Sequence, residues 1–471
     1  MRELPQGWIY TQFSEVLESI IGGGTPSKTN PEYFEGSIPF MTVKDLHERF
    51  PRDTIDHISE SAVSDSATSI VPEDTLIVAT RMSLGKIVRP KFQTAINQDL
   101  KALFLTDGLD KTYVEYWWRS QSTHIQSLGT GTTVKGIRLE DIKGLEFPVA
   151  PSPEQKRIAD KLDALLARVD ATRERLDHIP TLLKRFRQSV LAAATSGRLT
   201  EDWRAENPSA VSIRSVHNRG DTEQLPPKGQ VGGDVEGWLL TEVQAVATIG
   251  TGSTPLRSNA AYFSSIGTPW ITSAATSKNL VMSAEEFVTE YAIKDHRLKI
   301  YPIGTLLIAM YGEGKTRGQV TELGIEATIN QACAAIIVDE DKANRMFVKL
   351  VLQANYFEMR ELAEGGNQPN LNLSKIKEFP LTLPTLPEQT EIVRRVEALF
   401  ALADKVEARY TTARAQVDKL TPALLAKAFR GELVEQDPKD EPAEELLARL
   451  REVRENEPVK KRGRTAKPRM E

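Results

Sequence analysis

The feature that most constrains the fold of this chain is an internal repeat with an offset of about 230 residues. The segment "DTLIVAT" at Asp74 matches "GTLLIAM" at Gly304, and "TAINQ" at Thr94 matches "ATINQ" at Ala327. Further matches keep the same order: "GWIY" with "GWLL", "GTPSKTNPEYF" with "STPLRSNAAYF", "LEDIKGLEFP" with "LSKIKEFP", and "PEQKRIADKLDALLARVD" with "PEQTEIVRRVEALFALAD". The 471 residues are therefore predicted to form two copies of one unit, each a globular part followed by a helical part.

The repeat predicts an α/β fold with two similar globular domains, separated by long helices that pair as an antiparallel coiled coil. Two segments lie outside the repeat. One is polar and rich in Pro and Gly, and the other is the charged C-terminal segment. The expected boundaries are a first domain over 1–150, a helical spacer over 151–199, a linker over 200–234, a second domain over 235–384, a distal helical spacer over 385–434 and a disordered, acidic then basic tail over 435–471.

Apolar residues in both helical parts recur in steps of four and three, which is the heptad pattern of paired helices. Ser152 and Gln155 are expected to cap the first helix as a capping box, and Pro180 and Pro422 to break or kink the helices. Gly197 and Gly431 suit left-handed caps at the helix ends. The predicted pairing seam consists of Ile158, Leu162, Leu165, Val169, Leu176, Ile392, Val396, Leu399, Val406 and Leu420.

Composition narrows the class of protein. With 40% hydrophobic and 27% charged residues the chain resembles a soluble globular protein, and it has no apolar run long enough to span a membrane. The single cysteine, Cys333, excludes an internal disulfide framework and fits a reducing compartment, so the cytoplasm is the expected location. The six histidines show no metal-ligand spacing, and no metal site is expected.

The stretch "AMYGEGKT", from Ala309 to Thr316, resembles a phosphate-binding P-loop but begins with Ala where the motif requires Gly. Its counterpart in the first repeat, "ATRMSLGKI", lacks both that Gly and the hydroxyl residue after Lys86. An ATP site is therefore disfavoured. Both copies share an apolar run followed by a loop that carries Gly and Lys.

Loops at matching points of the two repeats concentrate basic and amide side chains, although the net charge of the chain is −5. Lys and Arg can hold phosphate or read guanine, and Asn and Gln can read adenine, so these loops are candidates for nucleic-acid binding. An ordinary solvated surface is the alternative for any one of them. The candidates are Lys28, Lys44, Arg81, Ser83, Lys86, Arg89, Lys91, Thr133, Lys135, Arg138, Arg257, Tyr311, Lys315, Arg317, Asn367, Gln368 and Asn370.

Two variable globular units, each followed by a P-E-Q heptad helix, resemble the specificity subunit of a type I restriction-modification system. The resemblance rests on "SPEQKRIADKLDALLARVD", "LPEQTEIVRRVEALFALAD" and the strand-loop "GTLLIAMYGEGKTRG", and it extends to about Val434. The first loop, "TRMSLGK", departs from the family pattern because it lacks a Gly directly after the strand.

The resemblance implies two target-recognition domains that each read one half of an interrupted double-stranded DNA target. It also implies helices that space the domains and bind methyltransferase subunits, with restriction subunits joining through the complex. Methyl transfer and cleavage would then belong to those partners, which use S-adenosylmethionine, ATP and magnesium, while this chain binds no cofactor.

The residues agree with a non-catalytic chain. The sequence contains neither a [DNS]-P-P-[YFW] motif for amino-methyl transfer nor a glycine-rich loop for the methyl donor. Trp117, Trp118 and Trp270 are interpreted as packing residues, and Cys333 as a core residue. Two other classes stay open at this point: a helical scaffold that assembles partners without reading DNA, and an NTP-binding enzyme suggested by the loop around Lys315.

Overall fold

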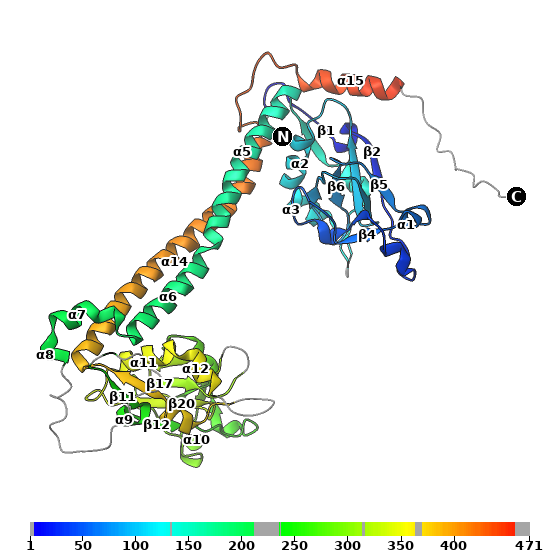
Figure 1. The fold of residues 1–471 in the computed structure, drawn as a ribbon. Helices are drawn as coiled ribbons and strands as arrows, with labels where there is room; N and C mark the ends of the chain where they lie inside the picture. The colour runs from blue at the N-terminus through cyan, green and yellow to red at the C-terminus, as the bar shows by residue number, and fades with distance from the viewer. Residues whose placement is uncertain are drawn as a thin grey trace, which may run out of the picture. The chain divides into compact units, whose positions relative to one another are not determined.

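The chain forms two compact units, each built on the globular part of one repeat, in the computed structural model, which describes residues 4–131, 134–211, 235, 237–312, 316–362 and 370–456. Unit 1 comprises Met1–Asp177 and Thr412–Glu471, and unit 2 comprises His178–Thr411 (Figure 1). Among the described residues, no helix is long and apolar enough to cross a membrane.

The globular part of unit 1 contains two four-stranded sheets and one strand pair. The order of the first sheet is β2-β9-β6-β7, all antiparallel, and that of the second is β4-β3-β8-β5, in which β3 and β8 run parallel. The strands are β1 (Ile9–Gln12), β2 (Leu17–Gly22), β3 (Ile38–Met41), β4 (Asp56–Ile58), β5 (Ser69–Val71), β6 (Leu76–Ala79), β7 (Ile87–Val88), β8 (Thr94–Ile96), β9 (Leu100–Leu105) and β10 (Glu146–Val149), with β1 paired to β10.

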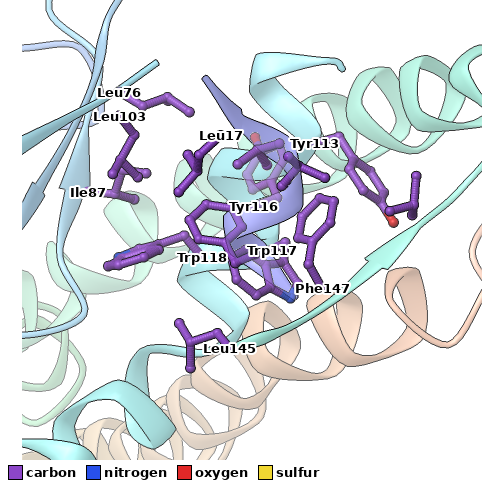
Figure 2. Packing of buried hydrophobic residues seen from close by; sticks show 14 of the residues in the cluster. Leu17, Leu76, Ile87, Leu103, Tyr113, Tyr116, Trp117, Trp118, Leu145 and Phe147 are labelled. Carbon is purple, nitrogen blue, oxygen red and sulfur yellow. The ribbon is translucent and has the colours of Figure 1, made fainter. Parts of the chain in front are cut away.

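Short helices complete this part of unit 1. The ten-residue helix α2 lies on the sheets with most of its side chains buried, because its aromatic run supplies the centre of the core (Figure 2). Trp117 and Trp118 are fully buried beside Phe13 and Phe147, which confirms their interpretation as packing residues. The helices are α1 (Glu60–Ser64), α2 (Lys111–Ser120), α3 (Ser122–Leu128) and α4 (Leu139–Lys143), with 3-10 turns η1 (Phe13–Val16), η2 (Pro31–Phe34) and η3 (Val43–Asp45).

Unit 2 repeats this plan. Its buried strand "LLIA" is the counterpart of "LIVA" in unit 1, and every residue of both is buried. The sheets have the orders β12-β20-β17-β18-β15 and β13-β16-β14-β19, and β11 pairs with β21. The strands are β11 (Leu239–Glu242), β12 (Ala247–Thr251), β13 (Phe263–Ser264), β14 (Thr268–Ile271), β15 (Leu280–Val281), β16 (Glu286–Val288), β17 (Leu306–Ala309), β18 (Val320–Leu323), β19 (Thr328–Ile329), β20 (Cys333–Val338) and β21 (Pro380–Leu383).

The predicted core residues of unit 2 are confirmed, since Cys333 and Trp270 are both buried. Its helix α11 is the counterpart of α2 and has the same length of ten residues. The helical elements of this part are α9 (Val243–Val246), α10 (Glu290–Asp295), α11 (Arg345–Ala354), α12 (Tyr356–Glu361) and α13 (Leu373–Lys377), with 3-10 turns η6 (Ala260–Tyr262) and η7 (Ser273–Ser277).

Three long helices carry the spacers: α5 (Ser152–Asp177), α6 (Ile179–Thr195) and α14 (Leu386–Ala428). Within unit 1, α5 runs antiparallel to the last part of α14, since Arg173 pairs with Asp418 and Asp177 with Arg414. Leu162 and Leu166 share one core with Leu425 and Ala428.

Within unit 2, α6 packs against the first part of α14. Val190 and Ala194 lie in one core with Ile392 and Val396, and Arg187 pairs with Asp404 at 2.7 Å. The antiparallel helix pairing predicted from the heptads is therefore present, but α14 has two partners in turn, α6 and then α5.

That change of partner corrects part of the predicted seam. Val406 and Leu420 are exposed, at 38% and 44%, and Leu165 is only half-buried beside buried Leu166. An α-helix drifts against a strict heptad repeat, and the seam here is interrupted where α5 ends. Ala403 and Val417 of α14, which the same heptad pattern predicts to face the partner helix, are buried. The other predicted seam residues are buried or half-buried: Ile158, Leu162, Val169, Leu176, Ile392, Val396 and Leu399.

The helix ends were predicted with mixed success. Gly197 and Gly431 adopt left-handed φ values of 74° and 71°, which confirms them as cap residues. Pro180 stands in the first turn of α6, where a proline is tolerated, but α14 continues through Pro422. The capping box at Ser152 is wrong, because α5 already begins at this residue and Gln155 bonds elsewhere.

Two segments expected to lack structure are partly helical. The start of the predicted linker forms α7 (Glu201–Glu206) and α8 (Pro208–Val211), and Asp202 of α7 pairs with Arg395 of α14. The predicted tail forms α15 (Ala443–Asn456), because Leu446, Leu447 and Leu450 give it an apolar face that joins the core of unit 1. Residues 212–234 and 457–471 lie outside the described residues.

Candidate nucleic-acid interface

Several strands of unit 1 end at one place. Because β3 and β8 are parallel, their last residues Met41 and Ile96 lie side by side, and the amide of Asn97 donates to the carbonyl of Met41 at 3.2 Å. The last residue of β6, Ala79, pairs with Leu100 at the start of β9, and the amide of Thr80 donates to the carbonyl of Asp99 at 2.8 Å.

The end of β2 reaches the same point, since Gly22 pairs with Lys101. The loops that follow β2, β3, β6 and β8 therefore leave the sheets together. We call this set of loops, residues 23–30, 42–48, 80–86 and 97–99, the first loop edge.

The described residues 129–131 and 134–138 join the first loop edge. The amide of Met82 donates to the carbonyl of Lys135 at 3.0 Å, and the amide of Ile137 donates to the carbonyl of Thr80 at 3.0 Å. Lys86 and Lys135 are exposed in these two loops. Arg81 is also exposed, and its guanidinium lies 3.8 Å from the carboxylate of Asp99. Backbone bonds thus bring Lys135 to the loop that carries Arg81 and Lys86, although Lys135 lies far from them in the sequence.

Two predicted candidates pair with carboxylates of the same unit. Arg89 is buried, with its Nε 3.6 Å from Asp74 and 3.7 Å from Glu115, because it follows β7 and faces α2. Lys91 donates to Asp74 at 2.5 Å at the surface and lies over the ring of Phe50. The assignment of both residues to nucleic-acid binding stays a prediction.

The remaining candidates of unit 1 occupy several positions. Lys28 and Lys44 are exposed in loops of the first loop edge, and Arg138 is exposed at the start of α4. Ser83 is half-buried in the loop after β6. Thr133 lies outside the described residues.

Unit 2 has an equivalent second loop edge, made of the described residues 252–259, 272–279, 310–312, 316–319 and 330–332. The amide of Asn330 donates to the carbonyl of Ile271 at 2.9 Å, and the amide of Met310 to the carbonyl of Ala332 at 2.8 Å. The segment that contains Asn370 joins it, since the amide of Leu371 donates to the carbonyl of Met310 at 3.1 Å.

Of the predicted residues in unit 2, Tyr311 is exposed at this edge, and Arg317 and Asn370 are half-buried. Arg257 is exposed, but its guanidinium pairs with Glu286 at 3.0 Å and lies over the ring of Trp270. Lys315, Asn367 and Gln368 lie outside the described residues.

The element that follows β17 differs from the one that a phosphate-binding P-loop requires. The strand β17 is followed by a loop and then by the antiparallel strand β18, whereas a phosphate-binding P-loop leads into the N-terminus of a helix. The strands β17 and β18 thus pair as an antiparallel hairpin, while Gly314 and Lys315 lie outside the described residues.

Sequence reasoning missed the residues at the centre of both edges. The pair Asn97-Gln98 stands between β8 and β9, and Asn330-Gln331 stands between β19 and β20. Gln98 and Gln331 are exposed, and Oδ1 of Asn330 is buried without a hydrogen-bond partner among the described residues. Their identity in the two repeats, visible in "TAINQ" and "ATINQ", was the signal that could have found them.

Chemically, the two edges present amides and cations on loops that rigid sheets hold in place. Exposed amide groups can donate to phosphate oxygens or form paired hydrogen bonds with base edges, and Lys and Arg attract phosphate. Such a surface suits binding to the backbone and grooves of a duplex.

Comparison with known proteins adds independent findings. The family model described as type I restriction modification DNA specificity domain matches residues 5–181 and again 235–411. The chain is 27% identical over 458 residues to the type I restriction enzyme StySPI specificity subunit of Salmonella potsdam, covering 92% of this chain and 91% of that one. It is 29% identical over 439 residues to the EcoDI specificity subunit of Escherichia coli, covering 92% and 90%.

Among solved structures, the crystal structure of an HsdS subunit from Thermoanaerobacter tengcongensis is similar with a TM-score of 0.57 and 17% identity. That match covers 91% of this chain and 98% of the other. The likeness shows that the fold, two sheet-containing domains and long helices, is shared.

Proposed function

Because the chain belongs to the type I restriction-modification DNA specificity family, with two copies of the family domain, we propose that each copy reads one half of an interrupted DNA target. The chain is a DNA specificity subunit of such a system, and its two units are the target-recognition domains. One observation carries the assignment of the reading surface. In each unit, separate strands end around an Asn-Gln pair and place loops of different sequence there.

The two edges combine a shared and a variable part. The Asn-Gln pair is common to both units, whereas the neighbouring loops differ, as "TRMSLGK" and "MYGEGKT" show. A shared contact suits the sugar-phosphate backbone, which is the same in every target. The differing loops suit the bases, which would then differ between the two half-sites.

The partners of the chain in the complex follow from this role. We propose that methyltransferase subunits bind the paired helices α5, α6 and α14, and that restriction subunits join through them. Methyl transfer and cleavage, with S-adenosylmethionine, ATP and magnesium, would be supplied by those subunits. The exposed outer faces of α5 and α14, rich in charged residues, support a role in assembly. The antiparallel pairing of β17 with β18, with no helix among the described residues between them, speaks against the NTP-binding alternative.

A methylation map of host cells with and without this gene tests the proposal. The expected result is a gene-dependent modified motif with two defined halves and an unread gap. Combined substitution of Arg81, Ser83 and Lys86 by Ala should then relax base preference in one half only, since these residues belong to the first loop edge. Relaxation of both halves, or of neither with normal complex assembly, would contradict the assignment of one edge to one half. A complex that assembles without any sequence preference would support the scaffold alternative.

A further inference from the structure

Each globular domain is bonded to its own long helix by the same set of side chains. In unit 1 the first turn of α5 carries Glu154 and Gln155, which are 1% and 0% exposed. Oε1 of Gln155 accepts from the amide of Asp110 at 3.0 Å, and Nε2 donates to the carbonyl of Ala150 at 2.8 Å. Oε2 of Glu154 accepts from Nε1 of Trp8 at 3.0 Å.

Unit 2 repeats these bonds one for one. Oε1 of Gln389 accepts from the amide of Asn344 at 2.7 Å, and Nε2 donates to the carbonyl of Pro384 at 2.8 Å. Oε2 of Glu388 accepts from Nε1 of Trp238 at 3.2 Å. Both side chains are again buried. We call each set of Trp, Glu and Gln with its bonds a helix joint.

The helix joint connects two separate segments of its domain to the first turn of the helix. In unit 1 these are the segment before β1 and the N-terminus of α2, while the bond to Ala150 closes the short connection between β10 and α5. A helix attached only through the peptide chain can swing about that connection, whereas bonds to two further segments restrain its direction. Buried hydrogen bonds resist such motion because breaking them leaves polar groups without partners in the core.

We propose that the two helix joints are the positioning elements that set how strictly the complex selects the length of the unread gap. The inference rests on the proposed function and adds a structural origin for gap selectivity. One added base pair moves the second half-site by about 3.4 Å along the duplex and turns it by about 35° around the axis. A domain held at a fixed angle on its helix cannot follow that turn, whereas a domain on a loosened joint can.

The test uses the complete complex with its methyltransferase subunits and a library of targets. The targets keep both native half-sites and differ only by one base pair more or less in the gap. The measured quantity is the ratio of methylation at these altered gaps to methylation at the native gap. Gln155→Ala and Gln389→Ala should each raise this ratio about fivefold, as expected for loss of buried hydrogen bonds. The double variant should raise it further.

Matched variants separate positioning from general stability. Lys156→Ala and Thr390→Ala alter exposed neighbours on the same helix turns and should leave the ratio unchanged. Glu154→Gln keeps an oxygen that can accept from Trp8 and should also leave it unchanged. Trp8→Phe keeps ring packing but removes the indole donor, and it should raise the ratio even where a Gln variant fails to fold.

The outcomes distinguish this proposal from the function on which it rests. A raised ratio with unchanged half-sites supports the positioning role. Folded joint variants that lose methylation at every gap to the same degree would overturn it, as would a changed half-site sequence. If the unaltered complex shows no interrupted motif at all, the proposed function fails first.

Discussion

At the scale of single residues, the structure separates cations that face solvent from cations that hold the fold. Lys86 is exposed in the first loop edge, whereas Arg89, three positions later, is buried between Asp74 and Glu115. Lys86→Ala should reduce DNA binding by the complex and lower the slope of log affinity against log salt by about one, without loss of stability. The slope is measured by titrating DNA at several salt concentrations, with Lys161→Ala on the exposed face of α5 as the control.

Arg89→Ala should behave in the opposite way. Its removal leaves the buried Glu115 with fewer compensating charges, so it should cost about 2–4 kcal/mol of unfolding free energy. Chemical denaturation of the chain measures this effect. A stable Arg89→Ala variant with weakened DNA binding would instead support the sequence-based assignment of this residue to nucleic-acid binding.

The two joint glutamates also differ at the residue scale. Both carboxylate oxygens of Glu388 accept hydrogen bonds, since its Oε1 accepts from Thr200 at 2.8 Å and from Arg204 at 2.6 Å and its Oε2 accepts from Trp238. In Glu154, Oε1 is buried and accepts no hydrogen bond within the described part of the chain. Glu388→Gln is therefore expected to cost about 1–3 kcal/mol, whereas Glu154→Gln should be neutral or stabilising at neutral pH.

A pH dependence accompanies this difference. Burial raises the pKa of the Glu154 carboxyl, although the bond from Trp8 opposes the shift. An acid whose pKa is higher in the folded state takes up a proton on folding, so stability falls as pH rises from its ordinary pKa through the raised value. Glu154→Gln should remove this loss, which thermal unfolding at a series of pH values would reveal. Equal pH profiles for the two proteins would contradict the shift.

At the scale of elements, the two repeats bury opposite charges at the same position of the equivalent helices α2 and α11. Glu115 of α2 is fully buried and pairs with Arg49 at 2.8 Å and with Arg119 at 3.0 Å. The matching residue of α11, Lys349, is also buried and pairs with Glu322 at 3.3 Å. Each buried charge is therefore met by opposite charges within its own unit.

Reversing one charge of such a pair should be severe. Lys349→Glu would place a carboxylate beside Glu322 in the core, and about 3–5 kcal/mol of unfolding free energy should be lost. Adding Glu322→Lys should restore part of this loss, limited by the nearby Arg345. A double-mutant cycle measured by chemical denaturation gives the coupling. The absence of coupling would show that the pair does not hold α11 on its sheet.

Elements with strong local patterns were predicted well from the sequence. The buried strands β6 and β17, the heptad helices and the left-handed Gly197 and Gly431 all depend on neighbouring residues. The partner change along α14 was not predictable in this way, because it depends on where α5 ends and which helix α14 meets next. For the same reason Val406 and Leu420 fitted the heptad but are exposed.

The residues of the candidate site were likewise predictable only where the signal is local in the sequence. Basic loops such as the one with Arg81 were recognised by composition, but composition could not show that Arg89 turns inward to Glu115. The Asn-Gln pairs were visible as a repeat match, yet their central place depends on parallel pairing of strands distant in sequence. The helical pattern of the segment that forms α15 is visible in "PAEELLARLREV", but its place in the core of unit 1 was not predicted, because its acidic surroundings resemble a disordered tail.

At the scale of the whole molecule, we expect the paired long helices to set the length of the unread gap between the two half-sites of the DNA target. The helix α14 has 43 residues and α5 has 26 residues, which correspond to about 64 Å and 39 Å. The longer value follows from the continuity of α14 through Pro422. In each unit, part of α14 pairs with the other long helix of that unit. A change in the length of the coiled coil must therefore be made in both paired helices.

Inserting seven residues after Asp177 and seven after Thr411, at the boundaries of the two units, would add two heptad-preserving turns. The added length is about 10 Å, and at about 3.4 Å per base pair the unread gap should grow by about three base pairs. Both half-sites should stay the same, because neither loop edge is altered. Methylation sequencing of cells that carry the variant and its partner subunits measures the gap directly, and insertion in only one helix serves as the control that breaks the pairing. An active variant with the original gap would mean that the helices do not set the spacing.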